Sequence, residues 1–199
     1  MKKAVISITL LALTGIGGAA HASLTASADG KFVYDSELNI TWLADANFAF
    51  TNGDQTNGTM NWEGANSWAS NLNVANHGDW RLPTVNEMDH LFWVELGGAL
   101  GTPISTNHNT NYDLFQNIEG RYWSSEADPN NSSKALNLVF NGFVYNNGNS
   151  FSEDKHTGYY AMAVTLGSIV GSIVPEPETY AMLMAGLGLL GWRTRKTRN

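Results

Sequence analysis

Two apolar segments, one near each end of the chain, limit the part that can fold as a globular domain to the residues between them. The first begins with two lysines, continues with apolar residues and finishes at Ala20-His21-Ala22. A charged start, an apolar stretch and an A-x-A site are typical of a secretory signal peptide, here residues 1–22, which the Sec translocon exports. Cleavage after Ala22 would leave Ser23 as the mature N-terminus. A membrane anchor or a buried helix is the alternative.

The second segment, residues 175–199, places two prolines before a short apolar run and a basic cluster. Pro175 and Pro177 prevent an upstream helix from continuing into the segment. The run Tyr180–Trp192 would span about 20 Å as a helix, against a hydrocarbon core of about 30 Å, so flanking basic side chains must extend the span. We therefore expect a C-terminal transmembrane helix in a membrane-inserted precursor, with the preceding residues outside the cell membrane. A C-terminal core helix is the alternative.

The order of features in this segment resembles a PEP-CTERM sorting signal. Pro175-Glu176-Pro177 is followed by Thr179-Tyr180-Ala181, a glycine-bearing apolar run and terminal basic residues. The resemblance implies an exported protein whose tail is recognised by an exosortase, a membrane protease, and removed near the Pro-Glu-Pro stretch. It also implies a final place on the cell surface or in an exopolysaccharide matrix. The residues expected to carry sorting and processing are Pro175, Glu176, Pro177, Arg193, Arg195 and Lys196.

The residues between the two signals, 23–174, have the length of one ordinary domain. They contain five basic and 16 acidic residues, a formal charge of −11, which disfavours nucleic acid and anionic lipid as partners. Cations and neutral sugars are better suited. The chain has no cysteine, which excludes disulfides, zinc–thiolate sites and cysteine nucleophiles.

Sequence periodicity predicts a hairpin and two helices in the first half of this domain. β-branched and aromatic residues indicate strands over 31–34 and 39–43. Helical spacing predicts a helix over Trp62–Leu72 with Asn61 as its N-cap. Thr84 and Glu87 form a T-x-x-E capping box that starts a second helix, which ends at the glycine pair 97–98. An ion pair between Arg81 and Glu87 is expected to tie down the start of this helix.

The second half of the domain begins with a long polar segment, residues 99–121, whose apolar residues show no helical or strand periodicity. We call this segment the long excursion. Strands are expected after it. RYWSSE predicts a strand. KALNLVFNGFVYNN predicts a hairpin that turns at Asn141-Gly142 and returns over Phe143–Tyr145. Apolar and aromatic residues alternate over 160–166 and predict the last strand. Residues 167–174 are expected to form a Gly/Ser linker.

The segment DWRLPTVNEM, together with YWSSE and the hairpin after it, resembles the Lcl C-terminal type of domain, roughly from Lys31 to Leu166. We expect this domain to occupy residues 23–166. The resemblance implies an α+β, C-type-lectin-like fold with two helices and a small antiparallel sheet. It implies that the first hairpin lies beside the last strand, which would bring Lys31 near Leu166. The family is largely of unknown function and is distantly similar to formylglycine-generating enzymes, whose chemistry depends on cysteines that this chain lacks.

The sequence offers no catalytic motif, so we expect no enzyme and no catalytic residues. The histidines are dispersed, and none has a spacing that brings two metal ligands to one helix face. Calcium is the better cofactor candidate, because hard oxygen ligands are common. Asn52–Gly58 nearly matches a calcium-binding loop. A ligand or cation site is also expected in the loop after the YWSSE strand, from Glu126, Asp128, Asn130 and Asn131.

Three functions remain open for the domain. The first is a non-catalytic binding module for a glycan, a protein or a cation at the cell surface or in the matrix. The second is an enzyme that acts on exopolysaccharide, which would need paired carboxylates at a fixed separation. The third is a matrix scaffold without a specific ligand.

Overall fold

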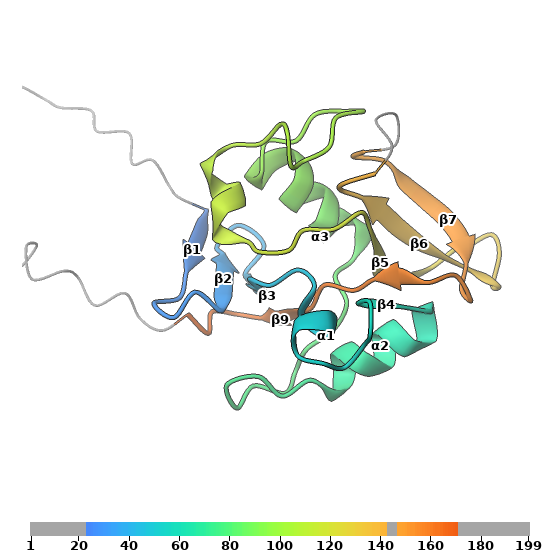
Figure 1. Cartoon of the computed structure of the whole chain (residues 1–199), viewed down its shortest axis with the longest axis horizontal. Helices are drawn as coiled ribbons and strands as arrows, with labels where there is room; N and C mark the ends of the chain where they lie inside the picture. Colours follow the sequence, from blue (N-terminus) through green and yellow to red (C-terminus); the bar gives the residue numbers. More distant parts are fainter. Residues whose placement is uncertain (1–22, 143–146, 171–199) are drawn as a thin grey trace, which may run out of the picture.

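The computed structural model describes residues 23–142 and 147–170, which form a mixed α+β domain with few helices and two mainly antiparallel sheets (Figure 1). The predicted signal peptide, the return strand Phe143–Tyr145 and the sorting tail lie outside the described residues. In the part that is described, none of the helices has the length and apolar character needed to cross a membrane.

The first sheet joins the beginning of the domain to its end. The last strand pairs antiparallel with the first hairpin, so that Ile40 faces Leu166. This confirms that hairpin and last strand lie side by side. Lys31 lies at the opposite end of the hairpin, beside Ala44, so its expected proximity to Leu166 was wrong. In spatial order the strands are β1 (Leu24–Ala26), β2 (Phe32–Asp35), β3 (Ile40–Leu43) and β9 (Val164–Leu166).

The second sheet contains the predicted RYWSSE strand. In spatial order its strands are β4 (Thr59–Met60), β8 (Tyr159–Tyr160), β5 (Arg121–Ala127), β6 (Lys134–Val139) and β7 (Ser150–Asp154). The expected single last strand is divided: β8 lies in this sheet and β9 in the first. Three successive buried residues, Ala161, Met162 and Ala163, lead from one sheet to the other. A regular strand would alternate its side chains between two faces, whereas this segment passes through the core.

The predicted two-residue turn at Asn141-Gly142 was wrong. β6 pairs with β7 so that Leu138 faces Ser150, which leaves a longer connection between them. Asn141 instead holds the long excursion in place: its side-chain amide donates to Ile118 O and its oxygen accepts from Ser105 N, both at 3.0 Å. Long-range hydrogen bonds therefore override the local turn preference.

Both predicted helices are confirmed, although the second changes its type. Helix α2 spans Trp62–Asn71, and the Asn61 side chain caps it by accepting from Gly64 N. Helix α3 spans Val85–Asp89 and begins with the predicted capping box of Thr84 and Glu87. It continues as a π-helix, η1 (His90–Glu95). A short helix, α1 (Phe48–Thr51), lies near α2, and α2 and α3 lie on opposite sides of the domain (Figure 1).

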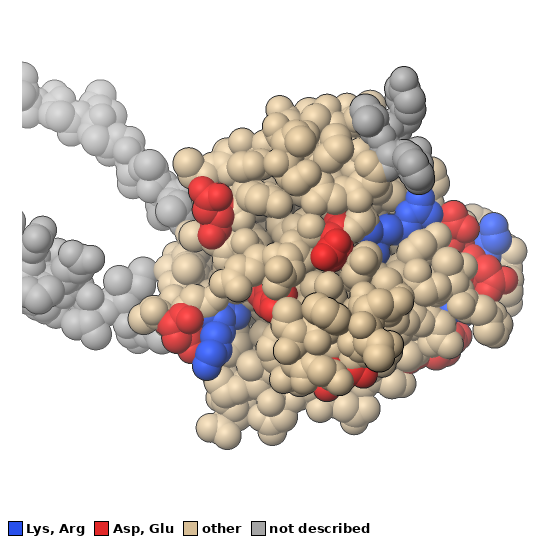
Figure 2. All heavy atoms as spheres, in the orientation of Figure 1, with Lys and Arg blue, Asp and Glu red and all other residues tan. Residues whose placement is uncertain are grey.

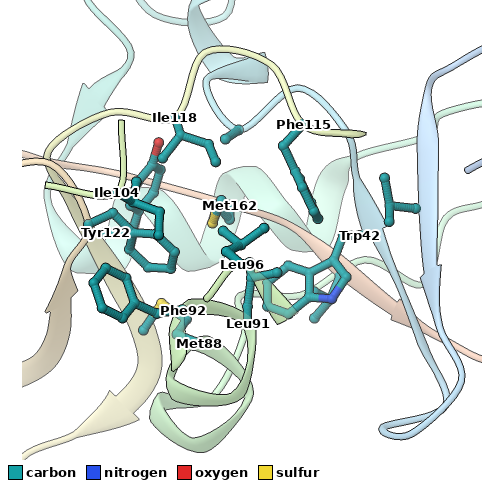
Figure 3. Packing of buried hydrophobic residues seen from close by; sticks show 14 of the residues in the cluster. Trp42, Met88, Leu91, Phe92, Leu96, Ile104, Phe115, Ile118, Tyr122 and Met162 are labelled. Atoms are coloured by element: carbon teal, nitrogen blue, oxygen red, sulfur yellow. The ribbon is translucent and has the colours of Figure 1, made fainter. Parts of the chain in front are cut away.

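The long excursion contributes to the main core rather than forming a surface loop throughout. It contains a 3-10 helix, η2 (Thr110–Leu114), and buries Ile104, Phe115 and Ile118. Figure 3 shows Phe115 and Ile118 on one side of this core and Phe92 on the other, with Met162 between them. The excursion therefore packs in the same core as the buried side of α3 and η1.

The described part of the expected linker packs on the domain. Ile169 and Val170 lie against a small cluster that includes Trp80 and Leu72. Thr41 Oγ1 donates to Gly167 O at 2.7 Å. Residues 167–170 therefore continue the folded part, and all three hydrophobic clusters are built from residues 24–170.

Candidate functional site

An open groove of about 640 Å³ lies between α1, the loop that follows it, α2 and the segment after α2. This volume is within the range of small-ligand sites, roughly 300–1,000 Å³. The residues that line it are Phe48, Asn52, Asp54, Gln55, Gly64, Ser67, Trp68, Asn71, Leu72, Asn73, Val74 and Ala75.

The groove is polar on α2 because this helix is amphipathic. Its small residues Ala65 and Ala69 are fully buried against the second sheet, next to Trp123. Residues three and four positions apart share a helix face, so the buried alanines leave Ser67 and Asn71 on the exposed side. The groove wall thus follows from the same spacing that predicted the helix.

The loop after α1 ends at a glycine that packs closely on Asn47, so no other residue can replace it without movement. Gly58 has φ +76°, and a Cβ atom placed there would lie 1.9 Å from Asn47 Oδ1. Asn47 is itself buried. This close approach fixes the loop against the body of the domain, so its side chains line a defined surface.

Trp68 is the aromatic centre of the groove, and its orientation is fixed. Its indole Nε1 donates to Asp54 Oδ2 at 3.0 Å. Asn52 Nδ2 also donates to the Asp54 carboxylate, at 3.2 and 3.3 Å to its two oxygens. The ring is half-buried and packs on two hydrophobic clusters. Asp54, one oxygen ligand of the expected calcium-binding loop Asn52–Gly58, therefore serves to hold the tryptophan.

The other polar groups of the groove are uncharged. Side-chain amides and one hydroxyl supply both donors and acceptors, from Asn52, Gln55, Ser67, Asn71 and Asn73. Of the described residues that line it, Asp54 is the one ionisable group. Figure 2 shows that much of the visible face carries neither acidic nor basic side chains, and that the few basic ones lie beside acidic ones.

A smaller pocket of about 300 Å³ adjoins the groove and shares Phe48 and Val74 with it. It differs in charge, because Lys31, Asp29 and Asp45 line it. Lys31 is paired with Asp29 at 3.5 Å. The pocket therefore extends the groove toward the first sheet with one ion pair and the additional carboxylate of Asp45.

The residues predicted to bind a ligand or cation after the YWSSE strand lie at the end of β5 and in the connection to β6, and they have separate partners. Glu126 Oε2 accepts from Val85 N at 2.7 Å, at the start of α3. Asp128 accepts from Asn130 N and from the Ser152 hydroxyl. Asn131 Oδ1 accepts from Ser133 N and its hydroxyl. The structure thus uses many of these oxygens in turns and at a helix terminus, and the cation site there stays a prediction.

One further prediction concerns an ion pair, and one cluster of ionisable residues was not predicted. Arg81 and Glu87 form the expected ion pair, at 2.6 and 2.8 Å. The structure also brings together Asp35, His90 and Glu95, which the sequence did not indicate. His90 and Glu95 are five residues apart, about 140° around an α-helix, and meet only because η1 is a π-helix. A search for i, i+4 ligand pairs could not have found them.

The comparisons with known proteins agree with both sequence resemblances. The family model of the PEP-CTERM protein-sorting motif matches residues 174–196. A comparison with curated proteins finds none that matches the chain. The family model of the Lcl C-terminal domain matches residues 31–165, more than half of the chain and nearly all of the fold described above. The chain belongs to the Lcl C-terminal domain family.

Proposed function

We propose that this chain is a surface or matrix protein whose Lcl C-terminal domain binds a neutral glycan in the groove, without catalysis. The PEP-CTERM motif supports an exported protein that an exosortase processes. The finer steps belong to the proposal: Sec export with removal of residues 1–22, an inner-membrane precursor held by the tail, and release to the cell surface or an exopolysaccharide matrix.

The composition of the groove carries the glycan proposal. A fixed tryptophan offers an apolar face on which a sugar ring can stack, and amides that flank it offer donors and acceptors for hydroxyls. Apart from Asp54, which is occupied by Trp68 and Asn52, its described lining is uncharged. Such a lining suits a neutral polymer better than a nucleic acid or an anionic lipid.

The topology supports a C-type-lectin-like relationship as part of the same proposal. The start and the end of the domain pair through β3 and β9, while a long excursion covers the core. In this arrangement the loops are held by a closed scaffold, which is where binding residues are commonly found.

Two other functions compete with glycan binding. A matrix scaffold needs no specific ligand, and an enzyme acting on exopolysaccharide needs a pair of carboxylates across the substrate. In the groove, the described residues provide the single carboxylate of Asp54, and it is hydrogen-bonded to Trp68. This favours binding over hydrolysis.

The test is a glycan array and titration with the full chain, purified in detergent, in calcium and in chelator. We compare Asn71→Ala, in the groove, with Asn66→Ala, on the same helix but outside the groove lining. We expect binding of neutral glycans by the parent and by Asn66→Ala, and at least about tenfold weaker binding by Asn71→Ala and Trp68→Ala.

Each outcome separates the candidate functions. Equal binding by both asparagine variants would place the ligand elsewhere, and the absence of any binding would favour the scaffold. Release of shortened glycan, measured by mass spectrometry, would show an enzyme. Binding lost in chelator but retained in Asn71→Ala would favour the predicted cation loop around Asp128.

A further inference from the structure

The cluster of Asp35, His90 and Glu95 lies away from the groove, where the β2–β3 hairpin meets η1. His90 Nε2 is 3.1 Å from Glu95 Oε1 and 3.7 Å from Asp35 Oδ2. The carboxylate of Glu37 lies 3.8 Å from the same nitrogen. One ligand atom from each of Asp35, His90 and Glu95 lies within 4.8 Å of the other two.

Local structure aims these groups at one another. Asp35 Oδ1 accepts from Glu37 N and Leu38 N, both at 3.0 Å, in the turn of the hairpin. The same turn directs Oδ2 toward His90. The π-helical turn of η1 places His90 and Glu95 on the same side of the helix, and such turns are frequent at functional sites.

The cluster carries more negative charge than its neighbours balance. Asp35 is fully buried, Glu95 is 2% exposed, and Asp35 Oδ2 has no hydrogen-bond partner. Within residues 23–142 and 147–170, His90 is the ion-pair partner found for Asp35, Glu37 and Glu95. Even a protonated imidazole would balance one of these three carboxylates. Buried charges are generally paired or coordinate a metal, so the buried oxygen of Asp35 without a hydrogen-bond partner is suited to bind a cation.

We propose that Asp35, His90 and Glu95 bind a divalent transition-metal ion of the zinc class, with Glu37 completing the coordination. A tetrahedral ion with bonds of about 2.0–2.2 Å holds its ligand atoms about 3.3–3.6 Å apart. The two distances from His90 Nε2 bracket this value. The ion replaces the direct His90–Glu95 hydrogen bond, and Nε2 then donates its lone pair to the metal.

The types of ligand atom indicate which class of cation the site would bind. An imidazole nitrogen with carboxylates suits zinc and its neighbours in the first transition row, whereas calcium takes six to eight oxygen ligands. This site is therefore distinct in place and chemistry from the predicted calcium loop. It is also independent of the glycan groove.

A second layer of hydrogen bonds already orients Glu95. Its Oε2 accepts from the Ser23 hydroxyl at 2.5 Å and from Asn111 Nδ2 at 3.4 Å. Its main-chain oxygen accepts from Asn109 Nδ2 and Asn111 Nδ2. Oε1 is thereby left for the metal, as in sites where outer partners fix a ligand. The ion would join the first hairpin to η1, while Ser23, just before β1, holds Glu95 in place.

The experiment is calorimetric titration of the metal-free full chain with Zn²⁺ at neutral pH in non-ionic detergent. Asp35→Asn, His90→Gln and Glu95→Gln each remove one ligand while preserving size. His156→Gln is the matched control, because exposed His156 also contacts a carboxylate, Asp154 at 2.9 Å. Co²⁺ absorption reports the coordination, and the thermal midpoint with and without Zn²⁺ reports linkage to folding.

We expect one Zn²⁺ per chain, a raised midpoint, tetrahedral Co²⁺ bands and no comparable response to Ca²⁺. The three ligand variants should bind at least tenfold more weakly, and His156→Gln should bind as the parent does. Ser23→Ala keeps every ligand and should weaken binding by about tenfold, which tests the site if a ligand variant does not fold. Absence of stoichiometric Zn²⁺ binding, or binding unchanged in Asp35→Asn, His90→Gln and Ser23→Ala, would overturn the proposal.

Discussion

Replacing Glu87 by glutamine tests whether one carboxylate stabilises the start of α3. Glu87 accepts from both terminal nitrogens of Arg81, at 2.6 and 2.8 Å, and from Thr84 N at 2.8 Å. Glutamine keeps the size but removes the charge, and it presents an NH₂ group to donors. The capping box therefore loses its strongest acceptor.

The structure sets the size of the expected loss. The Glu87 side chain is 14% exposed, while that of Arg81 is 37% exposed. A buried pair broken on one side costs about 3–5 kcal/mol, and hydrogen bonds to charged groups contribute about 1.5–3 kcal/mol. Because solvent still reaches the guanidinium, we expect the lower range, about 2–3 kcal/mol at pH 7, or about 4–12 °C in the unfolding midpoint.

The loss should also depend on pH. Burial alone would raise the pKa of Glu87, but the hydrogen bonds and charge of Arg81 and the Thr84 N–H together hold that pKa below its ordinary value. A lowered folded-state pKa contributes stability above the unfolded value, and this stability disappears as the pH falls through the folded value. The difference between parent and Glu87→Gln should therefore shrink below about pH 4.3.

The assay is urea unfolding of fragment 23–170, which contains all three core clusters, followed by tryptophan fluorescence from pH 7 to pH 3. Glu153→Gln is the control, because the Glu153 side chain is 39% exposed, against 14% for Glu87, and its pair with Arg121 should be worth less than about 1 kcal/mol. An equal loss in both variants at pH 7, or a difference that does not shrink in acid, would refute the argument.

Three further predictions address the loop, the core and the tail. Gly58→Ala should lower the free energy of unfolding by about 2–4 kcal/mol, from the clash with Asn47 and the positive φ; an unchanged urea midpoint would contradict this. Tyr122→Phe leaves Glu119 N without its buried acceptor and should cost about 1–3 kcal/mol in the same assay. Intact-mass analysis in an exosortase-bearing host should find a species that starts at Ser23 and lacks residues 180–199, and neutralising the four tail bases should increase the uncleaved fraction. The four bases are Arg193, Arg195, Lys196 and Arg198. If the chain with the neutral tail is processed as the parent is, these bases are not an anchor.

Local interactions made several elements predictable. Asn61 caps α2, and Thr84 with Glu87 starts α3, because each cap is satisfied within three or four residues of chain. The part of the groove wall that α2 forms was also predictable, since the helical spacing of Ala65 and Ala69 decides which face of α2 is buried. The rest of the groove lining was not predictable, because it depends on the loop after α1 and the segment after α2 lying close together.

The sequence by itself determined what depends on order and spacing along the chain: the C-terminal sorting motif, the family, the caps of α2 and α3, and the pairing of the first hairpin with the last strand. The tertiary structure decided what depends on distant contacts. Asn141 bonds to residues 105 and 118 instead of making a tight turn. His90 meets Glu95 because the packed helix adopts a π-turn, and both meet Asp35 across the first hairpin. The physical reason is that burial and long-range hydrogen bonds together outweigh the small local turn and helix preferences on which sequence-based prediction depends.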